Sequence, residues 1–395
     1  MQIRTLRASD LDRAFDLDAD AFHVDEGRRE SWKRFTDPAR FVGAFEGERL
    51  LAMTGALGFG QFFGGRAVPM GGLSSVAVVP DARGRGIAKP VIRACVDAMR
   101  ERGEVISTLF PATTGFYRSL GWEVAGSYAI RKVLPRLLRD LPRPDAGALR
   151  PGESGDRDGM HACYASLAAG VNGCLDRPDD WWERLEARRE DRDVYVHTGV
   201  DGTIDGYLVY RQLDGEFGQF GGDFSIAVDE WVATGRDASL ALWRLLAGWA
   251  TQVDQIVFHG PVEDPLLLLL PEQVFEAMAE IRWMTRVIDA AGAVAARGFP
   301  AGLDVEVPLR LVDPECDAND GAFVLTVQKG RARLARGAGD AGPQIAATGF
   351  ASLYTGWATT ADLARAGVLY GGSDAERAAL DAAFAGPTPW LLDEF

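Results

Sequence analysis

The apolar residues of the N-terminal third follow the two spacings that mark strands and helices. A run rich in β-branched residues, from Val76 to Val79, stops at Pro80 and predicts a strand. After a basic loop that contains glycines, apolar residues recur at helical spacing as far as Arg102, and Gly103 ends the pattern. The shared helical face carries Ile87, Val91, Ile92, Cys95, Ala98 and Met99.

Further elements on both sides of this unit make residues 1–133 an alternating α/β segment. Ser9 is expected to cap a helix over residues 10–21. The other expected elements are strands at Val105–Phe110 and Trp122–Val133, a short helix that Gly121 closes, and a hairpin with its turn at Glu46-Gly47-Glu48 between Phe41–Phe45 and Leu50–Leu57.

A proline-rich stretch between Leu134 and Arg157 predicts a linker, and the order of elements after it repeats the first arrangement. Where the first segment has its basic loop, the second has Ala233-Thr-Gly-Arg-Asp237, with one glycine fewer and a carboxylate that repels anions. We interpret this segment as a duplicated domain without the first domain's site. Its expected elements are helices near 157–169, 179–188 and 238–253, and strands at 193–199, 204–212, 224–232 and 255–259.

The last segment begins near Trp283 and predicts a small α+β domain. A helix is expected over 284–297, and Ser373-Asp-Ala-Glu376 forms a capping box at the start of a final helix. Strict alternation predicts two strands, at Leu303–Leu311 and Phe323–Val327. The predicted fold class is therefore α/β followed by α+β, with domains at 1–140, 150–283 and 284–395.

Composition narrows the possible functions. The 395 residues carry a formal net charge of -15, which argues against nucleic acid and anionic membranes as partners and is compatible with cationic small molecules. No segment has the length of a signal peptide core or a membrane span. Four scattered cysteines indicate neither disulfides nor a metal site, so a reduced, cytoplasmic protein is expected.

The basic loop Arg83-Gly84-Arg85-Gly86 is the strongest chemical signal in the chain. It lies where a strand gives way to a helix, and the first N–H groups of a helix lack intrahelical partners at the positive end of its dipole. Two glycines let an anion approach the backbone closely. The loop matches neither a Walker motif nor a dinucleotide fingerprint. An ordinary strand-to-helix turn is the alternative.

Arg83-x-x-Gly86-x-Ala88, followed by Phe116-Tyr117 and Gly121-Trp122, resembles the acetyl-CoA site of the GNAT N-acetyltransferases over residues 1–133. The whole chain is similar to the Eis (enhanced intracellular survival) family of that superfamily. The resemblance rests on a GNAT segment, a degenerate second copy, an α+β segment and the terminal Asp-Glu-Phe395. It implies a third domain shaped like sterol carrier proteins, acetyl-CoA as co-substrate and a homohexamer.

The resemblance also implies roles for individual residues. Tyr117 matches the family's general acid, and the α-carboxylate of Phe395 matches its general base. The sequence without the resemblance favours a core aromatic residue at Tyr117 and a docked chain end for the apolar tail. Gly84 and Ala112-Thr113 depart from what relatives carry. The implied acetyl-CoA contacts are Val76, Ala77, Val78, Arg83, Gly84, Arg85, Gly86, Ile87, Ala88, Lys89, Ala112 and Thr113.

An acceptor pocket is expected between the N-terminal helices and the tail, because carboxylates and aromatic faces suit cationic amines. Any of its residues alone is also readable as a solvated surface side chain. The residues expected there are Phe22, Asp25, Glu26, Trp32 and Glu394.

The sequence therefore predicts an acetyl-CoA-dependent N-acetyltransferase acting on amines of cationic small molecules, with aminoglycosides as plausible acceptors. One alternative keeps the chemistry and makes the acceptor a polyamine or a protein lysine. Another is a non-catalytic acyl-CoA or lipid carrier, which would be indifferent to the change Tyr117→Phe.

Overall fold

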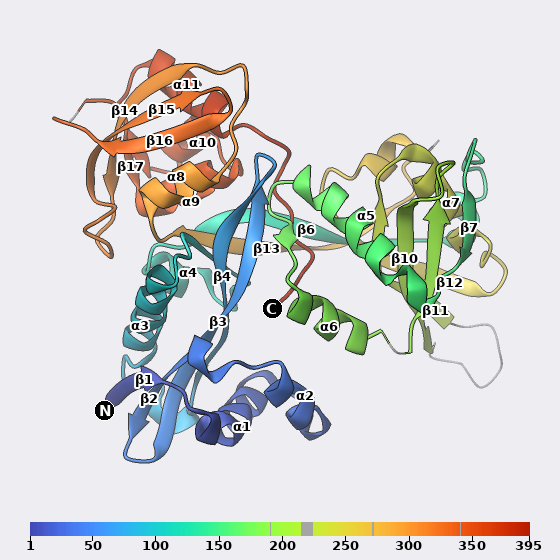
Figure 1. The fold of residues 1–395 in the computed structure, drawn as a ribbon, viewed down its shortest axis with the longest axis horizontal. Coiled ribbons are helices and arrows are strands. Elements are labelled where there is room, and N and C mark those ends of the chain that lie inside the picture. Colours follow the sequence, from blue (N-terminus) through green and yellow to red (C-terminus); the bar gives the residue numbers. More distant parts are fainter. Residues whose placement is uncertain (190, 215–223, 271, 340) are drawn as a thin grey trace.

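The computed structural model describes residues 1–395 except 190, 215–223, 271 and 340. In Figure 1 the N-terminal part (blue to teal), the middle part (green to yellow) and the C-terminal part (orange to red) form three bodies. The first two share one 13-stranded sheet, in which β6 pairs antiparallel with β12. A separate 5-stranded sheet belongs to the third. Tandem GNAT-like folds followed by an α+β domain were predicted, and this arrangement is confirmed.

The first part follows the predicted alternation. Helix α3 buries the expected face and ends before Gly103, whose φ is +80°. The cap of the first helix was predicted wrongly. Ser9 lies inside a 3-10 turn, and the carboxylate of Asp10 instead accepts from the Arg7 N–H. The elements are β1 (Gln2–Thr5), α1 (Leu11–Phe22), α2 (Arg29–Arg34), β2 (Phe41–Glu46), β3 (Arg49–Phe63), β4 (Arg66–Val78), α3 (Ala88–Glu101), β5 (Ile106–Leu109), α4 (Thr114–Arg118) and β6 (Glu123–Val133).

The second part repeats the order of the first, and it differs from the sequence prediction in three places, one of which is the short strand β8 (Leu175–Asp176) that was not predicted. Helix α7 ends at Ala247, because residues 248–252 turn into the next strand, and part of the predicted linker forms β7 at the sheet edge. The elements are β7 (Ala148–Pro151), α5 (Arg157–Ala169), β8 (Leu175–Asp176), α6 (Asp179–Ala187), β9 (Asp193–Thr198), β10 (Ile204–Asp214), β11 (Phe224–Ala233), α7 (Arg236–Ala247) and β12 (Val253–Gly260).

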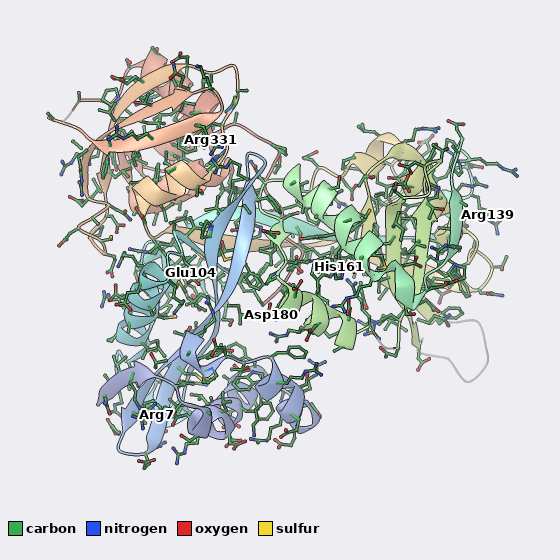
Figure 2. The ribbon with its side chains drawn as sticks, in the orientation of Figure 1. Arg7, Glu104, Arg139, His161, Asp180 and Arg331 are labelled. Carbon is green, nitrogen blue, oxygen red and sulfur yellow. The ribbon has the colours of Figure 1, made fainter. Side chains whose placement is uncertain are left out.

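Helices α5 and α6 lie next to the centre of the molecule and are held together by aromatic contacts. His161 on α5 (Figure 2) stacks on the Trp182 indole of α6, with 3.8 Å between ring centroids. Tyr164 meets the same indole edge-on at 5.4 Å. This packing sets the direction in which the other face of α6 presents its side chains.

Strand β13 (Glu276–Val287) returns from the second part and inserts between β5 and β6 of the first. The helix predicted over 284–297 is therefore wrong at its start. Residues 283–287 are all buried, including Thr285 and Arg286, so the sequence shows no strand alternation there that could tell a strand from a helix. The helix itself, α8 (Ala290–Ala296), begins after Asp289, which caps it through Gly292. The predicted domain boundary at 283 falls within β13.

The third part has the two predicted strands and the predicted final helix, whose capping box between Ser373 and Glu376 is present. After α11 the chain leaves this part and runs back to the centre of the molecule, where it ends (Figure 1). The remaining elements are β14 (Val305–Val312), β15 (Gly321–Gln328), β16 (Arg331–Arg336), β17 (Gln344–Ala346), α9 (Ala347–Thr355), α10 (Thr360–Arg365), β18 (Leu369–Tyr370) and α11 (Asp374–Phe384).

Candidate active site

Strands β4 and β5 part in the middle of the first domain. Their parallel pairing extends from Met70 opposite Ile106 to Gly72 opposite Thr108 and then stops, although β4 continues to Val78. Beyond Gly72, β4 therefore has an edge that faces no strand. Such an edge offers backbone hydrogen-bonding groups to a ligand that lies between the strands.

A β-bulge marks the same stretch of β4. On β3, Met53 pairs with Ala77 and Gly55 with Ser74, so two residues of β4 lie opposite Thr54. One of them, Ser75, has a φ of +50°, which is uncommon for a residue other than glycine. The bulge bends β4 away from β5 and turns Ser74 and Ser75 toward a cavity.

The three predicted β4 contacts lie on this unpaired stretch. Ala77 is buried on the side of α1, whereas Val76 and Val78 are half-buried against the cluster under α3. Alternation along the strand thus leaves both faces closed and the backbone edge open.

The basic loop that follows β4 is an open cradle of N–H groups. Gly84 and Gly86 have φ of +77° and +75°, and a Cβ built on either would meet nothing within 4 Å. The N–H groups of Gly84 and of residues 86–89 donate to no other described group. Because these donors surround open space at the start of α3, the site fits a diphosphate. Arg85 pairs with Glu46 at 2.7 Å, and Arg83 donates to the Val78 carbonyl at 3.3 Å.

Tyr117 lies on α4, in the same hydrophobic cluster as Ile87 and Val91 of the loop and α3. Its side chain contacts Trp122 and Phe116 edge-on, and the residue is 7% exposed. Burial raises the pKa of its phenol above the ordinary value. The hydroxyl makes no hydrogen bond to another described residue, so it is not committed to capping the backbone.

The C-terminal tail is anchored by a buried ion cluster of the second domain. Asp393, 6% exposed, accepts from Arg177 Nε at 3.0 Å, from the Trp181 indole at 2.9 Å and from the Tyr164 hydroxyl at 3.3 Å. Arg177 also donates to Glu230 at 2.6 Å. A buried charge held by this many partners fixes the position of the chain next to it.

This anchoring places Phe395 inside the first domain. Its ring packs against Phe59 and Phe110, at centroid distances of 5.2 and 5.9 Å. A Cβ built on Gly72 would come within 2.7 Å of the same ring. The chain end therefore reaches the point where β4 and β5 part, while no direct contact among the described residues joins Phe395 to Tyr117.

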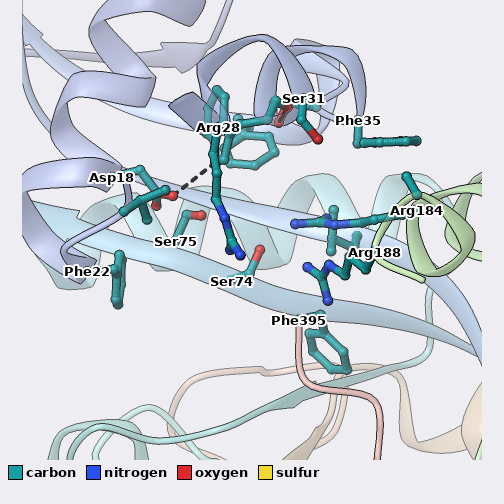
Figure 3. A pocket seen from close by; sticks show the side chains of 16 residues that line it. Asp18, Phe22, Arg28, Ser31, Phe35, Ser74, Ser75, Arg184, Arg188 and Phe395 are labelled. Carbon is teal, nitrogen blue, oxygen red and sulfur yellow. Dashed lines mark hydrogen bonds between the residues drawn. The ribbon is translucent and has the colours of Figure 1, made fainter. Parts of the chain in front are cut away.

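A cavity of about 450 Å³ opens beside Phe395, between the N-terminal helices, the bulge of β4 and helix α6 (Figure 3). Asp18 lies on its wall, where the Trp32 indole donates to it at 2.9 Å, and burial raises the pKa of its carboxyl. The lining residues are Asp18, Phe22, Val24, Arg28, Ser31, Trp32, Phe35, Thr36, Phe41, Leu57, Ser74, Ser75, Arg184, Ala187, Arg188 and Phe395.

Only part of the predicted acceptor pocket lines this cavity. Phe22 and Trp32 do. Asp25 instead caps a 3-10 turn through Gly27, and Glu26 pairs with Arg29 at 2.6 Å. Glu394 accepts from the Tyr128 hydroxyl and faces a second cavity on the other side of the tail.

Sequence reasoning missed the polar residues that do line the cavity. Asp18 belongs to the expected first helix, and its position among apolar residues at helical spacing was the available signal. Arg184 lies on α6 of the second domain and Arg188 directly follows that helix, and nothing local to their sequence connects them with β4. Ser74 and Ser75 become lining residues only because of the bulge.

The corresponding loop in the second domain does not form an anion site. Gly235 precedes α7, and the Asp237 carboxylate accepts from the N–H of Asp145 at 3.1 Å while contacting Arg236 at 3.3 Å. A side-chain carboxylate thus occupies the N-terminus of this helix.

A bulged strand that parts from its parallel neighbour above an open N–H loop defines the class of GCN5-related N-acetyltransferases. Models of the acetyltransferase (GNAT) domain match residues 2–125 and 173–287, and a sterol carrier protein domain model matches 290–392. GNAT N-acetyltransferases use acetyl-CoA as co-substrate.

Solved structures and curated relatives resemble the chain over its length. The structure of a GCN5-related N-acetyltransferase from Kribbella flavida is 31% identical, with a TM-score of 0.88, and the match covers 100% of this chain and 98% of that one. One from Anabaena variabilis is 26% identical with a TM-score of 0.92, and both chains are fully covered. N-acetyltransferase Eis of Mycobacterium tuberculosis is 28% identical over 82% of this chain and 79% of its own.

The chain belongs to the GCN5-related N-acetyltransferases and is an enzyme of that class, and N-acetyltransferases named Eis are among its homologues. Within the described residues, no helix combines the length and apolar character needed to cross a membrane.

Proposed function

We propose that this chain transfers an acetyl group from acetyl-CoA to an amine bound in the cavity beside Phe395, by direct attack in a ternary complex. The observation that carries the proposal is the path of the tail. It ends where β4 and β5 part, between the open N–H loop and the cavity. The side with the open N–H loop suits acetyl-CoA, and the side with the cavity suits the amine acceptor.

On the acetyl-CoA side, the N–H groups of Gly84 and of residues 86–89 hold the diphosphate. The unpaired edge of β4 at Val76–Val78 binds the pantetheine arm and polarises the thioester carbonyl, the kind of preorganised electrostatic stabilisation that often dominates catalysis. Arg83 adds long-range attraction, and Arg85 does so if it leaves Glu46. Ala112 and Thr113 lie in the exposed link between β5 and α4, and the resemblance assigns them to the same site.

The transfer forms a C–N bond, breaks the C–S bond and moves two protons. One proton leaves the amine nitrogen, and the departing thiolate takes up another. Tyr117, with its free hydroxyl and raised pKa, is suited to giving a proton to sulfur as charge develops there. The α-carboxylate of Phe395 is suited to taking the amine proton, directly or through water.

The sequence predicted cationic small-molecule amines as acceptors, aminoglycosides among them, and left polyamines and protein lysines as alternatives. Aromatic walls at Phe22 and Trp32 support an amine in this cavity. A volume of about 450 Å³ with an open mouth admits a small molecule or the end of a longer one.

The proposal is tested by thiol release from acetyl-CoA across a panel of amines. We expect turnover by the wild type, and a fall in kcat of about 10²-fold or more for Tyr117→Phe with little change in KM for acetyl-CoA. A chain extended by two residues after Phe395 should lose turnover in the same way. Tyr370→Phe, an exposed phenol in the third domain, is the matched control. A wild-type kcat in Tyr117→Phe would remove Tyr117 from the mechanism, and a wild-type kcat in the extended chain would remove Phe395.

By the same resemblance we propose a homohexamer and a cytoplasmic location. Light scattering during size-exclusion chromatography tests the assembly, and a monomer at micromolar concentration would contradict it.

A further inference from the structure

Three arginines from two domains converge on the cavity beside Phe395. Figure 3 shows Arg28 reaching in from the N-terminal helices, while Arg184 on α6 and Arg188 at the end of that helix extend toward it. Arg28 and Arg188 are exposed and Arg184 is half-buried. Their sequence positions are far apart, so only the tertiary structure makes them one charged surface, which we call the arginine face.

The arginine face has no carboxylate partner of its own. None of its three guanidinium groups makes an ion pair or hydrogen bond with another described side chain, whereas nearby Arg29 and Arg34 pair with carboxylates. Burial and the neighbouring guanidinium groups lower the pKa of Arg184 to about 10. The three charges repel one another, and carboxylates that make no ion pair with them offset this repulsion in part: Asp18 and Asp180 near Arg184, and Asp393 near Arg188.

The acidic groups at the cavity do not cancel this charge. Asp18 is the only carboxylate side chain among the lining residues, and burial raises its pKa while the Trp32 indole already donates to it. The other negative group is the chain end at Phe395, which the proposed mechanism assigns to the amine proton. The cavity is thus net cationic around the acceptor.

Acetyl-CoA does not explain the arginine face. Its diphosphate belongs to the loop at residues 83–89, and none of those residues lines the cavity. The cavity instead lies against the bulge at Ser74–Ser75, on the side of α1 and α2. An anion bound there must come with the acceptor.

We propose that the acceptor is an amine that also carries an anionic group, a carboxylate or a phosphate, which the arginine face binds while the amino group points to β4 and the chain end. This inference rests on the proposed function. A planar guanidinium pairs with either anion through two parallel hydrogen bonds, so several arginines around one pocket suit both. Polycations would meet repulsion at this face.

The test compares amines matched in shape and differing in charge: phenylalanine with phenethylamine, and phosphoethanolamine with ethanolamine. In each pair we expect the anionic member to show kcat/KM at least about tenfold higher with the wild type. The pair with the larger ratio distinguishes carboxylate from phosphate. Arg184→Met and Arg188→Met should each reduce that ratio several-fold, because kcat/KM of the anionic member falls more than that of the neutral member. Arg34→Met, an exposed arginine of α2 outside the lining, should keep it.

A ratio near or below one in both pairs overturns the inference and leaves the proposed function intact, since the amines are still acetylated. If no amine is turned over, the proposed function fails. Calorimetric titration of N-acetylphenylalanine against N-acetylphenethylamine then decides the inference by binding alone. The inference is supported if the wild type binds N-acetylphenylalanine more tightly than N-acetylphenethylamine and Arg184→Met loses this preference. Equal binding of the two ligands by the wild type overturns the inference.

Discussion

The tail anchor gives the sharpest prediction, because one buried carboxylate connects the second domain to the chemistry of the first. Changing Asp393 to Asn removes the charge that faces Arg177 at 3.0 Å and leaves the Trp181 and Tyr164 donors with one acceptor oxygen. Breaking a buried pair outright costs about 3–5 kcal/mol. Arg177 keeps Glu230 at 2.6 Å, so we expect the lower end of that range, about 3 kcal/mol.

That free energy acts on docking of the tail. At 1.4 kcal/mol per factor of ten, about 3 kcal/mol shifts the docking equilibrium by roughly 100-fold. We therefore expect kcat of Asp393→Asn to fall about tenfold or more, while KM for acetyl-CoA stays within about twofold because residues 83–89 are untouched. Carboxypeptidase A should also release Phe395 much faster from the variant than from the wild type.

The matched control is Asp381→Asn in the third domain. Asp381 accepts from the backbone N–H of Thr360 at 2.7 Å and from its hydroxyl at 2.8 Å, and it does not contact the tail. The variant Asp381→Asn should lower the stability of the protein without faster release of Phe395. Faster release with unchanged kcat in Asp393→Asn would refute a catalytic role for the chain end. Unchanged release from Asp393→Asn would refute the shift in the docking equilibrium of the tail.

Three further predictions concern single residues. Gly86→Ala should raise the Kd for coenzyme A, measured by calorimetry, by roughly 5- to 30-fold, because an alanine at a φ of +75° costs about 1–2 kcal/mol in the loop that binds the diphosphate. Gly103→Ala, at a φ of +80° outside that loop, should leave the Kd unchanged. Burial raises the pKa of Asp264 to about 6. The nearby Arg131 does not donate a hydrogen bond to this carboxyl, because its guanidinium donates to backbone carbonyls instead. The folded state then binds more protons than the unfolded state between about pH 4 and 6, so stability falls as pH rises through that window. Asp264→Asn should abolish this fall in urea unfolding and stabilise the protein by up to ~2 kcal/mol at pH 7.5. Ser373→Ala should lose about 1 kcal/mol of unfolding free energy with its capping box, and no loss would contradict that cap.

Local patterns were enough for most elements and for the loop. Periodicity located α3 and β6, and glycine spacing located the open N–H cradle at Gly84 and Gly86, because those features depend on neighbours a few residues apart. The family resemblance added Tyr117 and Phe395, which remain predictions about roles. Errors occurred where a local signal was ambiguous, as in the fully buried run of β13.

What the sequence determined by itself is most of the succession of strands and helices, the capping box of the final helix, and the chemistry of a single contiguous loop. The tertiary structure alone decided that β13 completes the first sheet, that Asp393 is bound by Arg177, and that arginines about 155 residues apart (28 and 184) share one cavity. The physical reason is range. Hydrogen-bonding propensity and amphipathic spacing act within a few residues, whereas charge and apolar burial act between surfaces that are brought together only when the domains pack.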